Sequence, residues 1–142
     1  MRKNPWLWAA IVVQLLTAAF HSLSFIIKDE PSNSTEQQIH DLIRTYKKDL
    51  GLGFAPTFWD LFTALSSCMV FLCLLAGFTN LFLVRKNAGV SIIKGVVGIN
   101  VIIFGAAFAV MLAFTFIMPI ACIGLIFLLL LIAWFTIREK KM

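Results

Sequence analysis

Charged side chains are scarce in this sequence of 142 residues, of which 13% are charged and 61% are hydrophobic. A soluble domain usually carries about 25% charged and about 45–50% apolar residues. Because a chain this short has a high surface-to-volume ratio, one small core cannot bury the apolar excess. The composition, with a mean hydropathy of +0.94, therefore excludes an ordinary water-soluble domain and indicates one compact domain whose solvent is lipid.

Cysteine is also scarce and is not arranged to hold a metal. Cys68, Cys73 and Cys122 all lie inside apolar runs, and no C-x-x-C spacing is present. Free cysteine in such a place behaves as a small buried hydrophobe. The sequence also lacks a nucleophile triad, a phosphate-binding loop and paired carboxylates within the apolar runs. We therefore predict no metal and no cofactor, and we regard an enzyme as the least favoured class.

Three long runs of the sequence carry almost no charge. Residues 6–27 and 58–84 form two such runs, the second with Asp60 as its only charge. Residues 95–137 form a third run of 43 uncharged positions. As one helix it would be about 65 Å long, against a hydrocarbon core of about 30 Å, so it must fold back. Because proline is tolerated in the first turn of a helix but not in its interior, Pro119 favours a turn within residues 115–119.

The predicted fold class is therefore an all-α membrane protein, an antiparallel four-helix transmembrane bundle. The predicted spans are residues 6–27, 58–84, 95–114 and 118–137.

The 30 residues between the first two spans, 28–57, form an outer loop with a pattern of its own. Capping residues Asn33–Thr35 are followed three positions on by the capping-box partners Glu36–Gln38. Apolar residues then recur at helical spacing from Ile39 to Leu50, and Gly51 or Gly53 can end the helix. This predicts a short amphipathic helix, which is either a plain solvated helix or a lid over the bundle.

The net charge of +5 does not indicate nucleic acid, because the basic residues lie at the ends of apolar runs, where they set membrane orientation. With a cytoplasmic N-terminus, eight basic residues are inside: Arg2, Lys3, Arg85, Lys86, Lys94, Arg138, Lys140 and Lys141. Four are outside: Lys28, Arg44, Lys47 and Lys48. The excess on the inner side predicts that both termini are cytoplasmic.

Polar residues inside the spans are expensive in lipid and are the candidate site residues. His21 and Thr17 share a polar stripe of the first span, and Asp60 opens the second span beside Trp59. His21 lies about 9 Å and Asp60 about 5 Å below the outer ends of two antiparallel helices. We therefore predict that His21 and Asp60 interact, directly or through one water, and that they form a ligand site with Thr17 and Trp59. The alternatives are a structural histidine, a hydrated helix-end acid and a tryptophan of the interfacial aromatic belt.

Two amides, Gln14 in the first span and Asn100 in the third, lie at similar depths on the inner side. We predict that they form interhelix polar contacts. Gly105, Ala109 and Ala113 follow each other at intervals of four, a pattern that lets helix backbones approach closely. The third span is thus predicted to be the most enclosed, and the wholly apolar fourth span to face lipid.

The stretch Pro56–Phe62, after a first span with a late His21, resembles a family of small bacterial four-helix membrane proteins. These proteins open the second span with a Trp-Asp-Phe-like sequence and join the last two spans at an aromatic, proline-containing turn. Phe114–Pro119 is similar to that turn. The resemblance covers nearly the whole chain and implies the four-helix fold and a bacterial inner membrane, but no activity.

A weaker resemblance is to the emopamil-binding and sigma-2-type proteins, four-helix sterol isomerases and ligand receptors. They share cytoplasmic termini, a lumenal helix and an aromatic opening of the second span. Their ligand site uses acids within the bundle, for which only Asp60 and Asp29 are available here. The second, deeper acid is missing, which argues against isomerase chemistry.

Two hypotheses about function remain from the sequence. In one, the bundle binds a lipid-like or other apolar ligand in its outer part, with His21, Asp60 and Thr17 as polar groups. In the other, the protein is a non-catalytic accessory or assembly subunit, whose partner is another membrane protein or a second copy. A ligand cavity containing His21 and Asp60 would favour the first hypothesis, and a filled core would favour the second.

Overall fold

The computed structural model describes residues 4–27 and 30–138, and the regular elements in these ranges are helices. Their order is α1 (Pro5–Leu23), α2 (Ser34–Thr45), α3 (Phe58–Arg85), α4 (Val90–Phe114) and α5 (Ile117–Thr136). Four of them, α1, α3, α4 and α5, are long and apolar enough to cross a membrane. The protein is thus an all-α integral membrane protein, as its composition predicts.

Two compact units make up the chain. Unit 1 contains the residues up to Ala18 and those from Leu72 onward, and unit 2 contains Ala19–Phe71. Unit 1 therefore holds most of α1, the second half of α3 and the whole of α4 and α5. Unit 2 holds the end of α1, the loop with α2, and the first half of α3.

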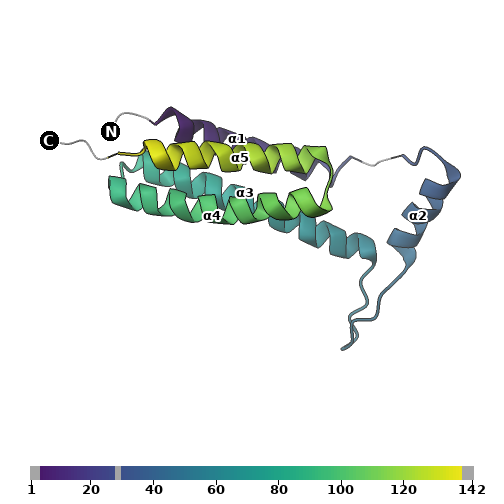
Figure 1. Ribbon diagram of the computed structural model, residues 1–142. Helices are drawn as coiled ribbons and strands as arrows, with labels where there is room; N and C mark the ends of the chain where they lie inside the picture. The colour runs from purple at the N-terminus through teal and green to yellow at the C-terminus, as the bar shows by residue number, and fades with distance from the viewer. Residues whose placement is uncertain (1–3, 28–29, 139–142) are drawn as a thin grey trace. The chain divides into compact units, whose positions relative to one another are not determined.

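The helices of unit 1 pack around buried aliphatic and aromatic side chains. The largest of these side chains are each at most 2% exposed, and they include Leu7, Ile11, Phe104, Ile126 and Leu130. The start of α1 and the end of α5 lie at the same end of the unit, where Asn4 Nδ2 donates a hydrogen bond to Thr136 Oγ1 (3.0 Å; Figure 1). Asn4 also caps α1, because its Oδ1 accepts from the backbone N–H groups of Trp6 and Leu7.

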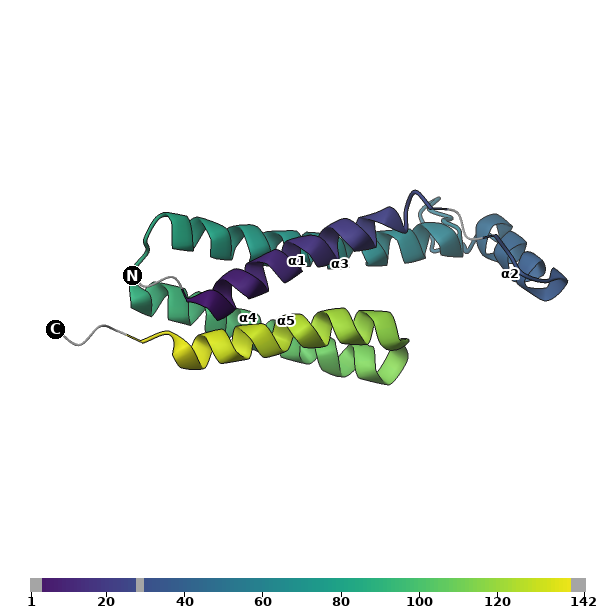
Figure 2. The ribbon, with the colours of Figure 1, turned by 90° about the horizontal axis from the view of Figure 1, so that it is seen from above.

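Helices α4 and α5 form an antiparallel pair that runs side by side in both views, and Figure 2 shows the short turn that joins them. Two glycines allow the close approach. A Cβ on Gly124 would lie 2.7 Å from Phe108 Cε2, and one on Gly105 would lie 3.0 Å from Phe127 Cε2. Each helix thus seats a phenylalanine ring on a glycine of the other helix. The two rings stack with their centroids 6.1 Å apart.

The prediction that the third span is the most enclosed is wrong. In the most apolar stretch of α4, 17% of the residues are buried, against 28% in α5. Gly105 takes part in packing, but Ala109 and Ala113 are exposed. A run of small residues permits close approach on one face but does not require a neighbour along its whole length. Nor does a wholly apolar sequence place α5 in lipid, because apolar side chains fill a core equally well.

The limits of the spans differ by more than one residue from those predicted at two ends. Helix α1 ends at Leu23, and residues 24–27 continue as tight turns in which Ser24 Oγ donates to the His21 carbonyl (2.7 Å). This bond offers the backbone an alternative to the helix. Helix α4 begins at Val90, so that Lys94 lies inside it, with its Nζ 5.4 Å from the Trp134 ring centroid. A lysine near a helix end is tolerated because its long side chain reaches out of the apolar layer.

The turn between the last two spans falls where proline predicts it. Helix α4 ends at Phe114 and α5 begins at Ile117, which places Pro119 in the first turn of α5. Thr115 is the C-cap of α4, and its hydroxyl donates to the Met111 carbonyl (2.8 Å).

The outer loop in unit 2 contains the predicted helix. Asn33 Oδ1 accepts from Glu36 N (2.9 Å), so α2 has the predicted cap, and none of its residues is buried. The helix ends at Thr45, however, before the two glycines. Gly51 (φ +86°) and Gly53 (φ +78°) instead form the tip of a narrow arm. Its two sides are joined by the Lys47–Thr57 bridge and by hydrogen bonds from Lys48 N to the Pro56 carbonyl (2.9 Å) and from Leu50 N to the Phe54 carbonyl (3.0 Å).

Several charged residues used in the sequence analysis lie outside the described residues. They are Arg2, Lys3, Lys28, Asp29, Lys140 and Lys141.

Candidate ligand pocket in the outer loop

Unit 2 contains a pocket of about 420 Å³, which we call the loop pocket. It is lined by Phe25, Ile26, Ile27, Arg44, Thr57, Trp59 and Asp60. Ligand pockets of proteins are commonly about 300–1,000 Å³ in volume, with apolar walls and a few placed polar groups. The loop pocket falls within this range of volume, and its lining combines apolar side chains with one cation, one hydroxyl and one carboxylate.

Three segments of the chain bring these side chains together. The turns after α1 present Phe25, the last turn of α2 carries Arg44, and the first turn of α3 carries Trp59. The Arg44 guanidinium carbon lies 4.5 Å from the Trp59 ring centroid, a cation–π contact. Two residues further on, Tyr46 stacks on Phe58 with 6.0 Å between the centroids. These contacts hold the end of α2 against the start of α3.

Asp60 closes the first turn of α3 as part of a capping box. Its Oδ2 accepts from the backbone N–H of Thr57 (2.9 Å) and from the Thr57 hydroxyl (2.7 Å). The same hydroxyl accepts from the Asp60 backbone N–H (3.1 Å). Two free donors at the helix start are thereby satisfied reciprocally. Asp60 lines the pocket, and its Oδ1 has no hydrogen-bond partner within the described ranges.

A direct hydrogen bond or ion pair between His21 and Asp60, which the sequence analysis predicts, is absent from the described part of the chain. The Asp60 carboxylate bonds its own helix turn instead, because Thr57 is three residues away and already in register. The His21 ring packs edge to face on Phe25, with 6.1 Å between centroids. His21 is half-buried and does not line the loop pocket, although its neighbour Phe25 does.

The other predicted site residues divide between the two units. Trp59 lines the loop pocket together with Asp60. Thr17 belongs to unit 1 and lines none of the pockets described here.

The two predicted amides meet through a third one in the core of unit 1. Asn80 Nδ2 donates to Gln14 Oε1, and Asn100 Nδ2 donates to Asn80 Oδ1, each over 3.3 Å. Gln14 and Asn80 are at most 1% exposed and Asn100 is 9% exposed. This amide ladder links α1, α3 and α4. Gln14 Nε2 is buried and has no partner among the described residues.

Sequence analysis missed Arg44 and Asn80. From the sequence, Arg44 was considered only as a basic residue of the outer loop. Its position over Trp59 depends on where α2 ends, which the sequence did not predict correctly. Asn80 carried a signal that was available, because it is an amide deep in an apolar run, where an unpaired polar group is costly. It lies off the polar stripe of Asp60, Thr63 and Ser67 along the same helix.

Among the described residues, no group of three or more His, Cys, Asp or Glu side chains is placed to hold a metal ion. Comparison of the chain with protein-family models, with curated proteins and with solved structures gave no match. The two resemblances drawn from sequence motifs thus stay predictions, and the proposals below rest on the chain's own residues.

Proposed function

We propose that this integral membrane protein binds a lipid-like amphiphile in the loop pocket. The observation that carries the proposal is the joining of an apolar wall, Phe25–Ile27 with Trp59, to a cation and a carboxylate within one pocket of about 420 Å³. An apolar chain would lie along the wall, and a polar head group would meet Arg44 and Asp60.

The two charged groups define the head group. Arg44 makes no ion pair in the described part of the chain, so its donors are available to a phosphate or carboxylate. Asp60 Oδ1 is available to a donor, because Thr57 occupies only Oδ2. A head group that offers both an anionic oxygen and an ammonium or hydroxyl donor matches this pair. A zwitterionic or hydroxylated lipid is therefore the class of ligand proposed.

The level of the pocket in the membrane supports an amphiphile. Helix α3 has 28 residues and is about 42 Å long, which exceeds the hydrocarbon core of about 30 Å. Asp60 is the third residue of this helix. A head group bound there would remain near the membrane surface, where polar groups are hydrated, while its chain reaches the apolar layer.

We also propose that both termini are cytoplasmic and that the loop pocket opens on the external side of a bacterial inner membrane. The support is the distribution of basic residues, eight on the side of the termini and four on the side of the outer loop.

The test is binding of dihexanoyl phosphatidylethanolamine to the purified full chain in detergent, measured by native mass spectrometry. Arg44→Gln and Asp60→Asn should each weaken binding about tenfold, the value for loss of one charge-assisted hydrogen bond of about 1.4 kcal/mol. The asparagine side chain keeps an oxygen that accepts from Thr57, so the N-terminal cap of α3 is preserved. Lys48→Gln, a basic residue of the same arm that does not line the pocket, is the matched control.

Equal binding by the wild type and both pocket variants would contradict the proposal. Absence of any bound amphiphile in the wild type would favour the other hypothesis, a non-catalytic accessory or assembly subunit.

A further inference from the structure

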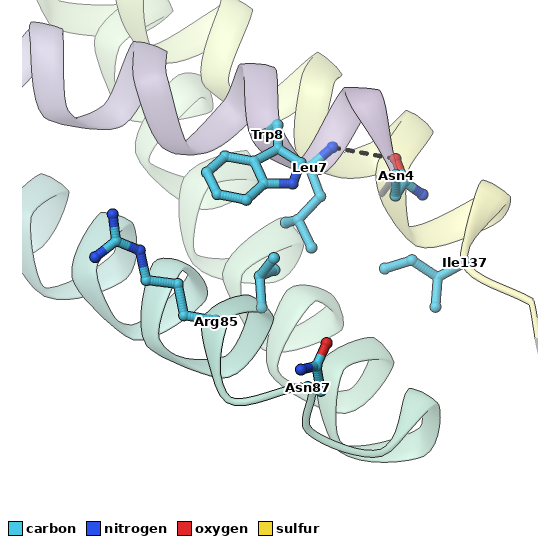
Figure 3. Close-up of a pocket in the computed structure, with 7 residues that line it drawn as sticks. Asn4, Leu7, Trp8, Arg85, Asn87 and Ile137 are labelled. Atoms are coloured by element: carbon cyan, nitrogen blue, oxygen red, sulfur yellow. Dashed lines mark hydrogen bonds between the residues drawn. The ribbon is translucent and has the colours of Figure 1, made fainter. Parts of the chain in front are cut away.

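A second pocket, of about 340 Å³, lies at the end of unit 1 where the described chain starts and stops. We call it the terminal pocket. Its lining comes from the start of α1, the end of α3 and the residue after α5: Asn4, Leu7, Trp8, Val84, Arg85, Asn87 and Ile137. Figure 3 shows the indole of Trp8 and the side chains of Arg85 and Asn87 arranged around it.

Two donors on the pocket wall have no acceptor among the residues that the structure describes. Trp8 Nε1 is buried and lacks a hydrogen-bond partner among the described residues. An indole N–H is a donor only, and a buried tryptophan usually finds a partner for it. Arg85, the last residue of α3, makes no ion pair within the described ranges. The buried Trp8 N–H therefore lacks an acceptor, while Arg85 is exposed and free of an ion pair, and an anionic oxygen would suit both donors.

Asn87 adds a third donor at a fixed place. The backbone of α3 ends in a Schellman motif, with Ala88 N bonded to the Leu83 carbonyl (3.0 Å) and Asn87 N to the Val84 carbonyl (3.2 Å). Asn87 occupies the left-handed position of this motif (φ +49°), which asparagine tolerates better than most residues. The motif holds the Asn87 amide on the rim of the pocket.

The charge of this end of unit 1 also favours an anion. The described residues of unit 1 contain four basic and no acidic side chains: Arg85, Lys86, Lys94 and Arg138. Lys94 and Arg138 line a neighbouring pocket that shares Ile137 with the terminal pocket. The donors of the terminal pocket therefore lie in a positive field, with no carboxylate among the described residues of unit 1 to compete for them.

We propose that the terminal pocket binds the phosphate of an anionic phospholipid. The phosphate oxygens would accept from Arg85, from Trp8 Nε1 and from the Asn87 amide, and the lipid chain would follow Leu7 and Val84 into the apolar layer. Basic pockets between transmembrane helices near the membrane surface are suited to anionic head groups. The site is separate from the loop pocket, with which it shares no residue.

The experiment measures binding of dihexanoyl phosphatidylglycerol to the full chain in detergent, with dihexanoyl phosphatidylcholine and inorganic phosphate as the other arms. The wild type should bind phosphatidylglycerol at least tenfold more tightly than phosphatidylcholine. Trp8→Phe, which keeps the ring and removes the N–H, should weaken this binding about tenfold, and Arg85→Gln should weaken it about tenfold or more. Asn87→Gly should weaken it less, and because glycine accepts φ +49° it leaves the helix end intact.

Lys86→Gln is the matched control, because Lys86 adjoins Arg85 but does not line the pocket. A loss below threefold for this variant supports a defined site. An equal loss for Lys86→Gln and Arg85→Gln would show general surface attraction and overturn the proposal, as would unchanged binding by Trp8→Phe. If inorganic phosphate binds as tightly as phosphatidylglycerol and is lost in the same variants, the phosphate site stands and its source is a soluble phosphate.

Discussion

At the scale of single residues, the amide ladder shows how polar groups are retained in an apolar bundle. Asn80 is its central member, since it donates to Gln14 and accepts from Asn100. Each bond alone is weak, because interhelix hydrogen bonds in membranes average about 0.6 kcal/mol. Loss of the centre is more costly, because it leaves two buried polar groups without partners, at about 1–3 kcal/mol each in proteins generally.

Asn80→Leu should therefore destabilise the protein by about 2–6 kcal/mol, measured as the free energy of reversible unfolding in mixed detergent micelles. Ser67→Ala is the control. Ser67 bonds only to the Thr63 carbonyl of its own helix, so its removal should have little effect. A triple variant with Leu at positions 14, 80 and 100 should be more stable than Asn80→Leu alone, because it leaves no orphaned amide. A stability unchanged by Asn80→Leu would mean that the ladder contributes nothing.

Sequence alone identified part of this residue-level picture. Gln14 and Asn100 were predicted as interhelix contacts. In the structure they are joined through Asn80, an amide of α3 that was not predicted. A direct His21–Asp60 bond is absent among the described residues, because matched depth and helix face do not exclude a closer partner for Asp60, and Thr57 provides one. The alternative predicted for Asp60 was a hydrated acid in the first turn of its helix, and the capping bonds with Thr57 were not predicted.

At the scale of elements, the pairing of α4 and α5 depends on glycines under aromatic rings. Gly124 lies beneath Phe108, whereas a Cβ on Gly95 of α4 would meet nothing within 4 Å. Gly124→Val and Gly95→Val should each raise helix propensity by a similar amount. The difference in unfolding free energy between the two variants therefore reports the effect of packing. Gly124→Val should be less stable than Gly95→Val by about 1–3 kcal/mol in the same unfolding assay, the typical cost of overpacking. Equal stability of the two variants would contradict the contact.

Helix existence was predictable because apolar runs of these lengths have few other solutions in lipid. Which face of each helix is buried was not predictable, and α4 shows the reason. The spacing of Gly105, Ala109 and Ala113 marks a face that allows contact, but the position of α5 decides that only Gly105 is covered. The end of α2 was also missed, because Gly51 and Gly53 serve a tight turn of the arm instead of a helix end.

At the scale of the whole molecule, the basic residues predict its direction in the membrane. In a background with Cys68, Cys73 and Cys122 replaced by alanine, Ser34→Cys should react with a membrane-impermeant maleimide added to intact cells. Lys86→Cys, just after the end of α3 that lies away from the outer loop, should react with the maleimide only after the membrane is permeabilised. Labelling of position 86 in intact cells would reverse the proposed topology and place the loop pocket in the cytoplasm.

The central claim is that the loop pocket holds an amphiphile, and photo-crosslinking tests it most directly. A phosphatidylethanolamine with a diazirine near the head of one acyl chain would be reconstituted with the full chain, irradiated and mapped by peptide mass spectrometry. Phe116 is 70% exposed and Ile26 is 77% exposed, so passive contact with bulk lipid would label the α4–α5 turn as much as the pocket. We predict instead that labels concentrate on residues 25–27 and on Trp59, and that they are reduced there in Arg44→Gln. Preferential labelling of residues 114–118, unaffected by Arg44→Gln, would contradict the account.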